Sequence, residues 1–347
     1  MKNRLLFIAA TASILALSGS ILAQQGAAPN SQMKAVLDAH ASLNPKPLEQ
    51  LSPEEGRKQP SIADGVAKIM KDQGKKPEAV GDISDREIPL SAGAVKARIY
   101  TPKGEGPFPT ILYIHGGGWV IADLDTYDAT PRALSNAANA VVISTHYRQS
   151  PEHKFPAAHE DVFGVYQWVL KNAGSIKGDT KRVAVVGESA GGNMAAAICL
   201  MAKEKSLQLP VHQVLVYPVA DMSGTPTPSK DENAQAKPLN KAMLDWFGKH
   251  LLAKPEDARN PRLSLLLAGD ELKGLPPATI ILAEIDPLRS EGEALAKALT
   301  TAGVEVNLKS YKGVTHEFFG MAAVVDLAKE AQSVVAADLK SAFSKAK

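Results

Sequence analysis

A serine, an aspartate and a histidine occur in the sequence in an order that suits nucleophilic catalysis. Ser189 lies in the pentapeptide GESAG at 187–191, Asp286 follows much later in the chain, and His316 follows Asp286. A serine hydroxyl is a weak nucleophile at neutral pH, so it needs a base that removes its proton and an acid that orients this base. The residue types and their order predict attack by the Ser189 hydroxyl on an acyl carbon, with His316 as base and Asp286 as its partner.

The glycine-rich segment HGGGW at 115–119 supplies a second requirement of this chemistry. Attack on an acyl carbon develops negative charge on oxygen, and backbone N–H groups can stabilise that charge. Consecutive glycines let such groups converge on one point, which side chains would prevent. We predict that the N–H groups of Gly117, Gly118 and Ala190 form an oxyanion hole and that His115 orients the loop by hydrogen bonding. A flexible loop without this role is the alternative.

Strands and helices must position these residues, and the apolar patterns around them indicate which elements do so. Residues 182–187 form a short β-branched run typical of a buried strand, and 193–201 are typical of a buried helix, so Ser189 lies on the turn between them. In an open α/β sheet the loops at the carboxyl ends of the strands share one crevice, which would bring Asp286 and His316 to Ser189. Further strands are predicted at 109–115, 211–217, 278–283 and 304–311, with a loop at 313–316.

Other interpretations of these residues stay open at this stage. Asp286 could instead cap a helix that begins near Pro287, and His316 could be a solvated loop histidine. Asp221, which follows the preceding strand, is the rival for the acid. Glu284 and Glu291 also follow the 278–283 strand but are expected to reach His316 less well than Asp286.

The chain contains the motifs HGGGW (115–119), YRQSPEHKFPAA (147–158), GESAGGN (187–193), DPLRSEG (286–292) and the His316 loop. Together these motifs resemble those of the bacterial hormone-sensitive-lipase-like (family IV) carboxylesterases, over about residue 85 to the C-terminus. The resemblance implies an α/β-hydrolase fold, with a mostly parallel central sheet flanked by helices, a helical cap over the site and ester cleavage without a cofactor. It also implies the roles already given to Ser189, Asp286, His316, Gly117, Gly118 and Ala190.

The sequence departs from the pattern of that family at two places. Gln149 and Ser150 stand where the family commonly has Leu-Ala, and Glu317 stands after the histidine where the family commonly has glycine. The second departure changes the charge beside the predicted base.

The motifs and the resemblance predict a serine carboxylesterase that hydrolyses short to medium acyl esters through an acyl-serine. The bulky residues Trp246 and Phe247, in a predicted cap helix at 242–252, favour that range of acyl length. An amidase or formamidase with the same residues is an alternative, because its chemistry differs mainly in protonating the leaving amine. A non-catalytic binding protein on the same fold is less consistent with the sequence, since Ser189, Asp286 and His316 are all retained.

The chain is expected to divide into three parts. Residues 1–23 resemble a secretory signal peptide, with Lys2 and Arg4 before an apolar stretch at 5–17 and small residues before cleavage after Ser20 or Ala23. This predicts a periplasmic or secreted protein. Residues 24–84 are expected to form an N-terminal segment with cap helices, including an amphipathic helix at 61–73. Residues 85–347 are expected to form the α/β-hydrolase domain, with a cap insertion at about 222–262.

Composition is ordinary for an enzyme in solution, with 45% hydrophobic residues, 22% charged residues and a formal net charge of +2. A small-molecule ester is the expected partner. Nucleic acid is not, because no basic run with interleaved aromatics occurs, and no stable membrane anchor is expected. The lone Cys199 permits no intramolecular disulfide, and the histidine spacings predict no metal. The sequence is compatible with a homodimer.

Overall fold

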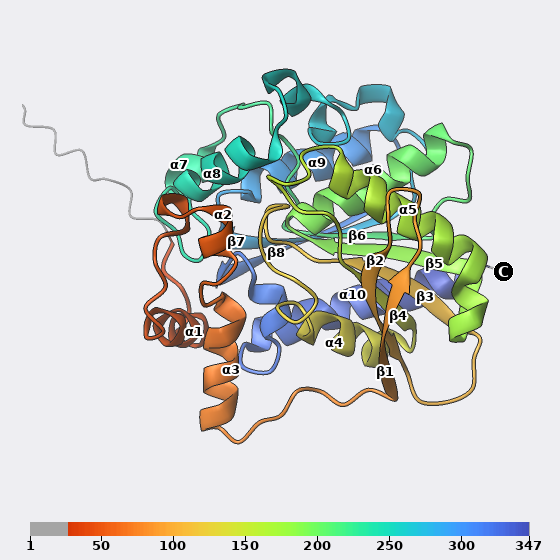
Figure 1. Cartoon of the computed structure of the whole chain (residues 1–347), viewed down its shortest axis with the longest axis horizontal. Coiled ribbons are helices and arrows are strands. Elements are labelled where there is room, and N and C mark those ends of the chain that lie inside the picture. The colour runs from red at the N-terminus through yellow and green to blue at the C-terminus, as the bar shows by residue number, and fades with distance from the viewer. Residues whose placement is uncertain (1–26, 347) are drawn as a thin grey trace, which may run out of the picture.

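The structure is a computed structural model that describes residues 27–346, so the signal peptide predicted for residues 1–23 lies outside it. Its centre is one sheet with the strand order β1-β2-β4-β3-β5-β6-β7-β8 (Figure 1). β2 pairs antiparallel with β1 and β4, and all the other neighbours are parallel. The strands are β1 (Asp82–Ile88), β2 (Val95–Thr101), β3 (Phe108–Ile114), β4 (Val141–Thr145), β5 (Gly178–Glu188), β6 (Gln213–Val216), β7 (Ala278–Ile285) and β8 (Val306–Thr315).

Helices cover both faces of this sheet. Alternate residues of a strand point to opposite faces, and in β3 Leu112 and Ile114 pack in one apolar core whereas Ile111 and Tyr113 pack in another. The first core is closed by α5 (Ala157–Asn172), α6 (Ala190–Glu204) and α9 (Arg289–Thr301), and the second by α4 (Ala129–Ala138) and α10 (Asp326–Lys345). Figure 1 shows these two groups of helices above and below the sheet. Cys199 is buried on α6, as its apolar surroundings predict.

The strands expected at 109–115, 182–187, 211–217 and 278–283 are all present, with small shifts at their ends. The last strand differs. We predict a strand at 304–311 and a loop at 313–316, but β8 continues to Thr315 and the loop prediction is wrong for residues 313–315. A register shift after Ala283 lets Ile285 of β7 pair with Thr315 of β8. Asp286 and His316 therefore follow directly paired residues on neighbouring strands.

Additional helices gather at one side of the molecule (Figure 1). The N-terminal segment forms α1 (Ser31–Ala41), α2 (Pro53–Gly56) and α3 (Ile62–Asp72), and the segment between β6 and β7 forms α7 (Pro228–Glu232) and α8 (Lys241–Leu251). α3 and α8 match the helices predicted at 61–73 and 242–252. We call residues 27–73 and 222–262 the two cap segments. β1 begins at Asp82, so the boundary predicted at residue 85 falls inside the first strand.

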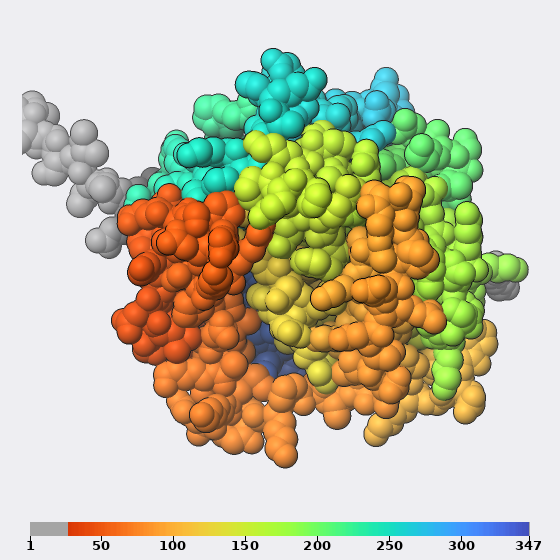
Figure 2. All heavy atoms as spheres, in the orientation of Figure 1, coloured from red at the N-terminus to blue at the C-terminus, as the bar shows by residue number. Residues whose placement is uncertain are grey.

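The two cap segments touch each other. The indole Nε1 of Trp246 on α8 donates to the carbonyl oxygen of Leu51 at 3.0 Å. Figure 2 shows one face of the molecule, on which the red and orange N-terminal segment meets the teal residues of the second cap segment. Within residues 27–346, no helix combines the length and apolarity needed to cross a bilayer.

Candidate active site

Ser189 occupies a sharp turn between β5 and α6. Its φ and ψ are 57° and −118°, a strained conformation for a residue with a side chain. The turn is possible because its flanking glycines lack side chains: a Cβ on Gly187 would lie 2.0 Å from the carbonyl oxygen of Gly191, and a Cβ on Gly191 would lie 2.0 Å from that of Ile114. The strand, turn and helix predicted around Ser189 are confirmed, and they hold its Oγ at the end of the central strand.

His316 and Asp286 lie beside this serine. Nε2 of His316 is 2.9 Å from Oγ of Ser189, and Nδ1 is 2.7 Å from Oδ2 of Asp286. The other oxygen of Asp286 accepts a hydrogen bond from the N–H of Leu288 at 2.8 Å, which fixes the carboxylate against the start of α9. Ser189, Asp286 and His316 are all buried. This arrangement can move a proton from the serine to the imidazole, with the carboxylate selecting the tautomer that donates from Nδ1.

The rival carboxylates have other partners. Asp221 accepts from the N–H of Ser223 and from the hydroxyl of Ser264. Glu284 accepts from the N–H of Gly313 at 2.7 Å, and Glu291 pairs with Lys230 at 2.5 Å. Asp286 is therefore the carboxylate that the structure brings to Nδ1 of His316.

The glycine loop faces the same site. Gly117 and Gly118 have φ of 89° and 57°, and a Cβ on either would lie 2.2 Å from its nearest neighbour, the carbonyl oxygen of Ile121 or the ring of Phe247. Among residues 27–346 the N–H groups of these two glycines have no hydrogen-bond partner. Ala190 is the first residue of α6, where N–H groups lack acceptors within the helix and carry partial positive charge. The three predicted oxyanion donors thus border the Ser189 turn.

Side chains hold the glycine loop from behind. The hydroxyl of Tyr147 donates to the carbonyl oxygen of Gly116 at 2.8 Å, and Nδ1 of His115 is 2.9 Å from the same oxygen. Burial lowers the pKa of His115 to about 3, so the ring is neutral. Nε2 of Gln149 donates to the carbonyl oxygens of Ile121 and Ala122 at 2.9 and 2.8 Å. At residue 149, where the family commonly has leucine, this chain thus has a side chain that makes two hydrogen bonds to the backbone just after the glycine loop.

The first cap segment also reaches the glycine loop. Nε of Arg57 donates to the carbonyl oxygen of Val120 at 2.8 Å, and its Nη2 donates to that of Ser150 at 2.8 Å. The same guanidinium pairs with Glu152 at 2.7 Å. The sequence offers no sign of this contact, because Arg57 is far from the loop along the chain and belongs to no motif.

A second group of ionisable residues surrounds His316. Glu188, next to the nucleophile, is fully buried and accepts hydrogen bonds from the hydroxyls of Tyr113, at 2.5 Å, and Tyr217. Burial, with repulsion from Glu317, raises the pKa of Glu188 to about 7. The ring of Tyr217 packs on His316 with 4.4 Å between centroids. Sequence reasoning missed Glu188 and both tyrosines, because only the folded sheet brings β3, β5 and the end of β6 together.

Glu317 lies on the other side of the histidine. Its φ of 72° is in the left-handed region that favours glycine. Its Oε1 accepts from the hydroxyl of Tyr127 at 2.6 Å and stands 3.9 Å from Nε2 of His316. Burial raises the pKa of Glu317, and His316 and Tyr127 offset part of this rise. For His316, burial disfavours the charged ring, but the nearby carboxylates, Asp286 foremost, outweigh burial and raise its pKa.

A cavity of about 700 Å³ opens beside Ser189. One wall carries the predicted reactive groups and the glycine loop, and the opposite wall is formed by the two cap segments. Within the described part of the chain, no cluster of His, Cys, Asp and Glu could hold a metal ion. The side chains that the two cap segments contribute to the wall of the cavity include Leu48, Ile62, Leu239, Met243 and Phe247.

Comparison with known proteins identifies relatives over most of the chain. A family model described as the alpha/beta hydrolase fold matches residues 111–320. The carboxylesterase NlhH of Mycobacterium tuberculosis is 39% identical over 254 residues, which cover 72% of this chain and 79% of that protein. An ethyl acetate hydrolase of Pseudomonas putida is 32% identical over 288 residues, which cover 82% of this chain and 88% of that protein.

Solved structures give the same result. A hyperthermophilic esterase from the archaeon Pyrobaculum calidifontis superposes with a TM-score of 0.83 at 35% identity, over 91% of this chain and 98% of that one. The predicted fold class and the family resemblance are therefore confirmed. The chain belongs to the α/β-hydrolase family, as a hormone-sensitive-lipase-like member of the kind that its motifs resemble.

Proposed function

We propose that this protein is a serine carboxylesterase in which Ser189 is the nucleophile, His316 the general base and Asp286 the acid that orients it. The observation that carries this proposal is the contact of 2.9 Å between His316 Nε2 and Ser189 Oγ, with Asp286 on the other ring nitrogen. The relatives named above are esterases, which favours ester over amide hydrolysis. None of those names supports the amidase or formamidase alternative.

Acylation uses groups that already stand in reach. The proton of Ser189 passes to Nε2 of His316 as Oγ bonds to the acyl carbon, and the carbonyl oxygen takes up the negative charge. The N–H groups of Gly117, Gly118 and Ala190 stabilise that oxyanion. The bond from the acyl carbon to the alcohol oxygen then breaks, and the proton on Nε2 goes to the leaving alkoxide. The products of this half-reaction are a free alcohol and acyl-Ser189.

Deacylation runs through the same groups. A water molecule gives a proton to Nε2 of His316 while its oxygen bonds to the acyl carbon. The bond to Ser189 Oγ then breaks, Oγ takes the proton back from Nε2, and the carboxylic acid leaves. Losing one oxyanion donor costs about 3 kcal/mol of barrier in comparable sites, so each of these N–H groups contributes roughly a hundredfold to the rate.

Ser189→Ala tests the assignment of the nucleophile. The variant should fold, because alanine fits wherever serine does, and it should lose hydrolysis of p-nitrophenyl butyrate. An organophosphate should label the wild type on Ser189, as peptide mass mapping can establish. A label on any other residue, or full activity in the variant, would overturn the proposal.

We also propose a preference for short to medium acyl chains. The cavity of about 700 Å³ is bounded by both cap segments, which contribute apolar side chains such as Leu48, Met243 and Phe247 to its wall. Such a covered site accommodates a compact ester more readily than a long triglyceride chain. A series of p-nitrophenyl esters measures kcat/KM against chain length, and an optimum beyond about a dozen carbons would contradict the preference.

The proposed location is the periplasm or the exterior of the cell, after cleavage of residues 1–23. The support is the charged start, apolar stretch and small residues of this segment. N-terminal sequencing of the protein from the expressing cell tests it, and intact Met1 would contradict it.

A homodimer is the proposed oligomeric state. β8 is an edge strand of the sheet, and Leu308 on it is 40% exposed. Edge strands offer unpaired backbone groups to a second chain. Sedimentation equilibrium would distinguish this dimer from a monomer.

A further inference from the structure

Glu317 places a carboxylate near the ring nitrogen of His316 that must protonate the leaving alcohol. Nε2 of His316 gives its proton to the alcohol oxygen, and an oxygen that accepts a hydrogen bond lies about 3 Å from its donor. Oε1 of Glu317 is 3.9 Å from the same Nε2. The alcohol oxygen of a bound ester therefore lies within about 7 Å of this carboxylate, which is within reach of a charge carried on the alcohol portion.

This carboxylate faces the cavity, unlike the others near the histidine. The side chain of Glu317 is 20% exposed and lines the cavity, whereas Asp286 and Glu188 are fully buried and line no part of it. Asp38 and Glu49 are also on the cavity wall, but they belong to the cap segments and not to the loop that carries the histidine. Glu317 is thus the acidic group presented to substrate at the reacting end.

The lysine and arginine side chains of the cavity are either exposed at its rim or already bonded to other groups. Lys46 and Lys237 are exposed at its rim, where solvent and salt screen them. The Arg57 guanidinium is paired with Glu152 and bonded to two backbone carbonyls. None of these three cations is bonded to Glu317, whereas His316, 3.9 Å from Oε1, opposes its charge when the ring is protonated.

Tyr127 holds the Glu317 carboxylate in place. Its hydroxyl donates to Oε1 at 2.6 Å and also lies against the glycine loop, since a Cβ on Gly116 would be 2.3 Å from that hydroxyl. A carboxylate fixed in this way needs no reorganisation when substrate binds, which favours a role in recognition.

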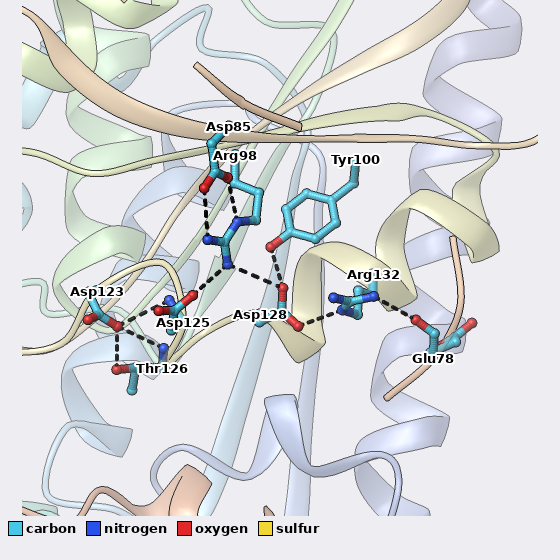
Figure 3. Close-up of polar contacts among 9 residues, drawn as sticks. All are labelled: Glu78, Asp85, Arg98, Tyr100, Asp123, Asp125, Thr126, Asp128 and Arg132. Carbon is cyan, nitrogen blue, oxygen red and sulfur yellow. Dashed lines mark hydrogen bonds and ion pairs between the residues drawn. The ribbon is translucent and has the colours of Figure 1, made fainter. Parts of the chain in front are cut away.

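The segment that carries Tyr127 is itself clamped to the sheet edge (Figure 3). Arg98 on β2 contacts Asp125 at 2.6 Å and Asp85 of β1 at 2.7 Å. Asp128, the next residue after Tyr127, accepts from the hydroxyl of Tyr100 at 2.7 Å and from Arg132 at 2.5 Å. These bonds fix the backbone on both sides of Tyr127, so its hydroxyl and the glutamate it binds have little freedom to turn away.

The backbone at Glu317 points to the same role. A residue other than glycine costs on the order of 1 kcal/mol in the left-handed region, and Glu317 adopts φ of 72°. Glycine would relieve that strain and is what the family commonly has there. Glutamate at position 317 therefore makes the backbone less stable but places a carboxylate in the cavity.

We propose that Glu317 is a specificity-determining residue that selects esters whose alcohol portion carries a positive charge close to the ester oxygen. The natural substrate class would then be esters of amino alcohols. This inference rests on the proposed esterase function and on Ser189 as its nucleophile.

Two esters of the same shape test it. Butyrylcholine and 3,3-dimethylbutyl butyrate differ in the charge of one central atom of the alcohol. We expect kcat/KM of the wild type to favour the cationic ester by about twofold to fivefold, as for a partly exposed charge pair. In Glu317→Gln, which can still accept the Tyr127 hydrogen bond, the ratio should fall to about one. Glu256→Gln removes the same charge from an exposed position outside the cavity, and its ratio should equal that of the wild type.

The outcomes separate this inference from the proposed function. An unchanged ratio in Glu317→Gln, with normal turnover of the neutral ester, would overturn the role of Glu317 and leave the esterase intact. Equal losses on both esters would also overturn it, because they would mean a purely structural role. A wild type that leaves the neutral ester uncleaved, or a Ser189→Ala variant that cleaves it, would overturn the proposed function itself. Glu317→Gly, which relaxes the backbone, gives a second variant without the carboxylate should the glutamine variant fold poorly.

Discussion

Asp286 uses both of its oxygens, and an asparagine can reproduce only one of them. Oδ2 faces Nδ1 of His316 while Oδ1 accepts from the N–H of Leu288. In Asp286→Asn one of these positions holds an NH₂ group, so the ring loses its charged partner or its correct tautomer. We expect kcat to fall by roughly 10³ to 10⁴ with little change in KM. Asp221→Asn should have a far smaller effect, and a reversal of the two results in steady-state kinetics would assign the acid to Asp221.

The pH dependence of kcat/KM should report the charge of Glu317, because this charge acts on the pKa of His316. The groups that face His316 are the carboxylates of Asp286, Glu317 and Glu188 and the ring of Tyr217, and the net effect of the carboxylates is to raise the pKa of His316. A base must be neutral to accept a proton, so kcat/KM rises as pH increases through that pKa. Removing one negative charge lowers the pKa.

Glu317→Gln should therefore move the acidic limb of the kcat/KM profile to lower pH. Profiles measured on the neutral butyrate ester avoid any titration of the substrate, and Glu256→Gln is the matched control. A limb that stays in place, or moves to higher pH, would show that Glu317 does not act on the histidine through its charge.

Glu188 should make stability depend on pH in the opposite sense from an ordinary ion pair. Its pKa rises from 4.5 to about 7 in the folded protein. The protonated acid therefore stabilises the fold fully below about pH 4.5, and this contribution is lost as pH rises through about 7. At about 1.4 kcal/mol per pH unit, the loss is about 3 kcal/mol. Glu188→Gln should remove this decline, as urea unfolding at a series of pH values would measure, and equal pH slopes in both proteins would contradict it.

At the scale of elements, the glycine loop and the residues just after it are held by three other parts of the chain, which are residues 147–149, Arg57 and Tyr127. Gln149 contributes two hydrogen bonds to the carbonyl oxygens of Ile121 and Ala122. Gln149→Leu, which restores the residue common in the family, removes both and leaves two carbonyls to find other donors. Each such bond contributes about 1 kcal/mol, so we expect kcat to fall about tenfold through misplacement of the oxyanion donors. Gln235→Leu, at an exposed position, is the control, and equal kinetics in both variants would contradict the argument.

The elements around Ser189 could be predicted because their signals are local. A β-branched run, a glycine-flanked serine and an apolar helix follow one another within a short stretch. The end of β8 could not, because Gly313 and the polar Thr315 look like a loop until the strand is paired with β7. That pairing depends on a register shift, which has no signature within either strand alone.

The partners of the site were beyond prediction for a related reason. Tyr127, Tyr217 and Arg57 belong to no motif and reach the site only through the order of strands in the sheet or the course of the cap segments. Their residue types suit packing or solvent as well as they suit a functional contact. Glu317 stood out in the sequence by its neighbour, His316, but its bond to Tyr127 and its place on the cavity wall require the folded chain.

For the whole molecule, the hydrogen bonds from Arg57 to the carbonyl oxygens of Val120 and Ser150 should hold the first cap segment in place even when the chain is cut after it. The segment that leads from α3 to β1 is exposed at residues 73–79, whereas the residues before it are bonded to the rest of the protein by side chains and backbone alike. Trp246 adds a bond to Leu51, and the N–H of Asn30 bonds to the carbonyl oxygen of Gly313. Covalent continuity is therefore not what keeps the first cap segment in place. Brief trypsin treatment, cutting after the exposed Lys75, should yield a nicked enzyme whose two fragments co-elute and still turn over ester, and which becomes inactive only when urea separates them.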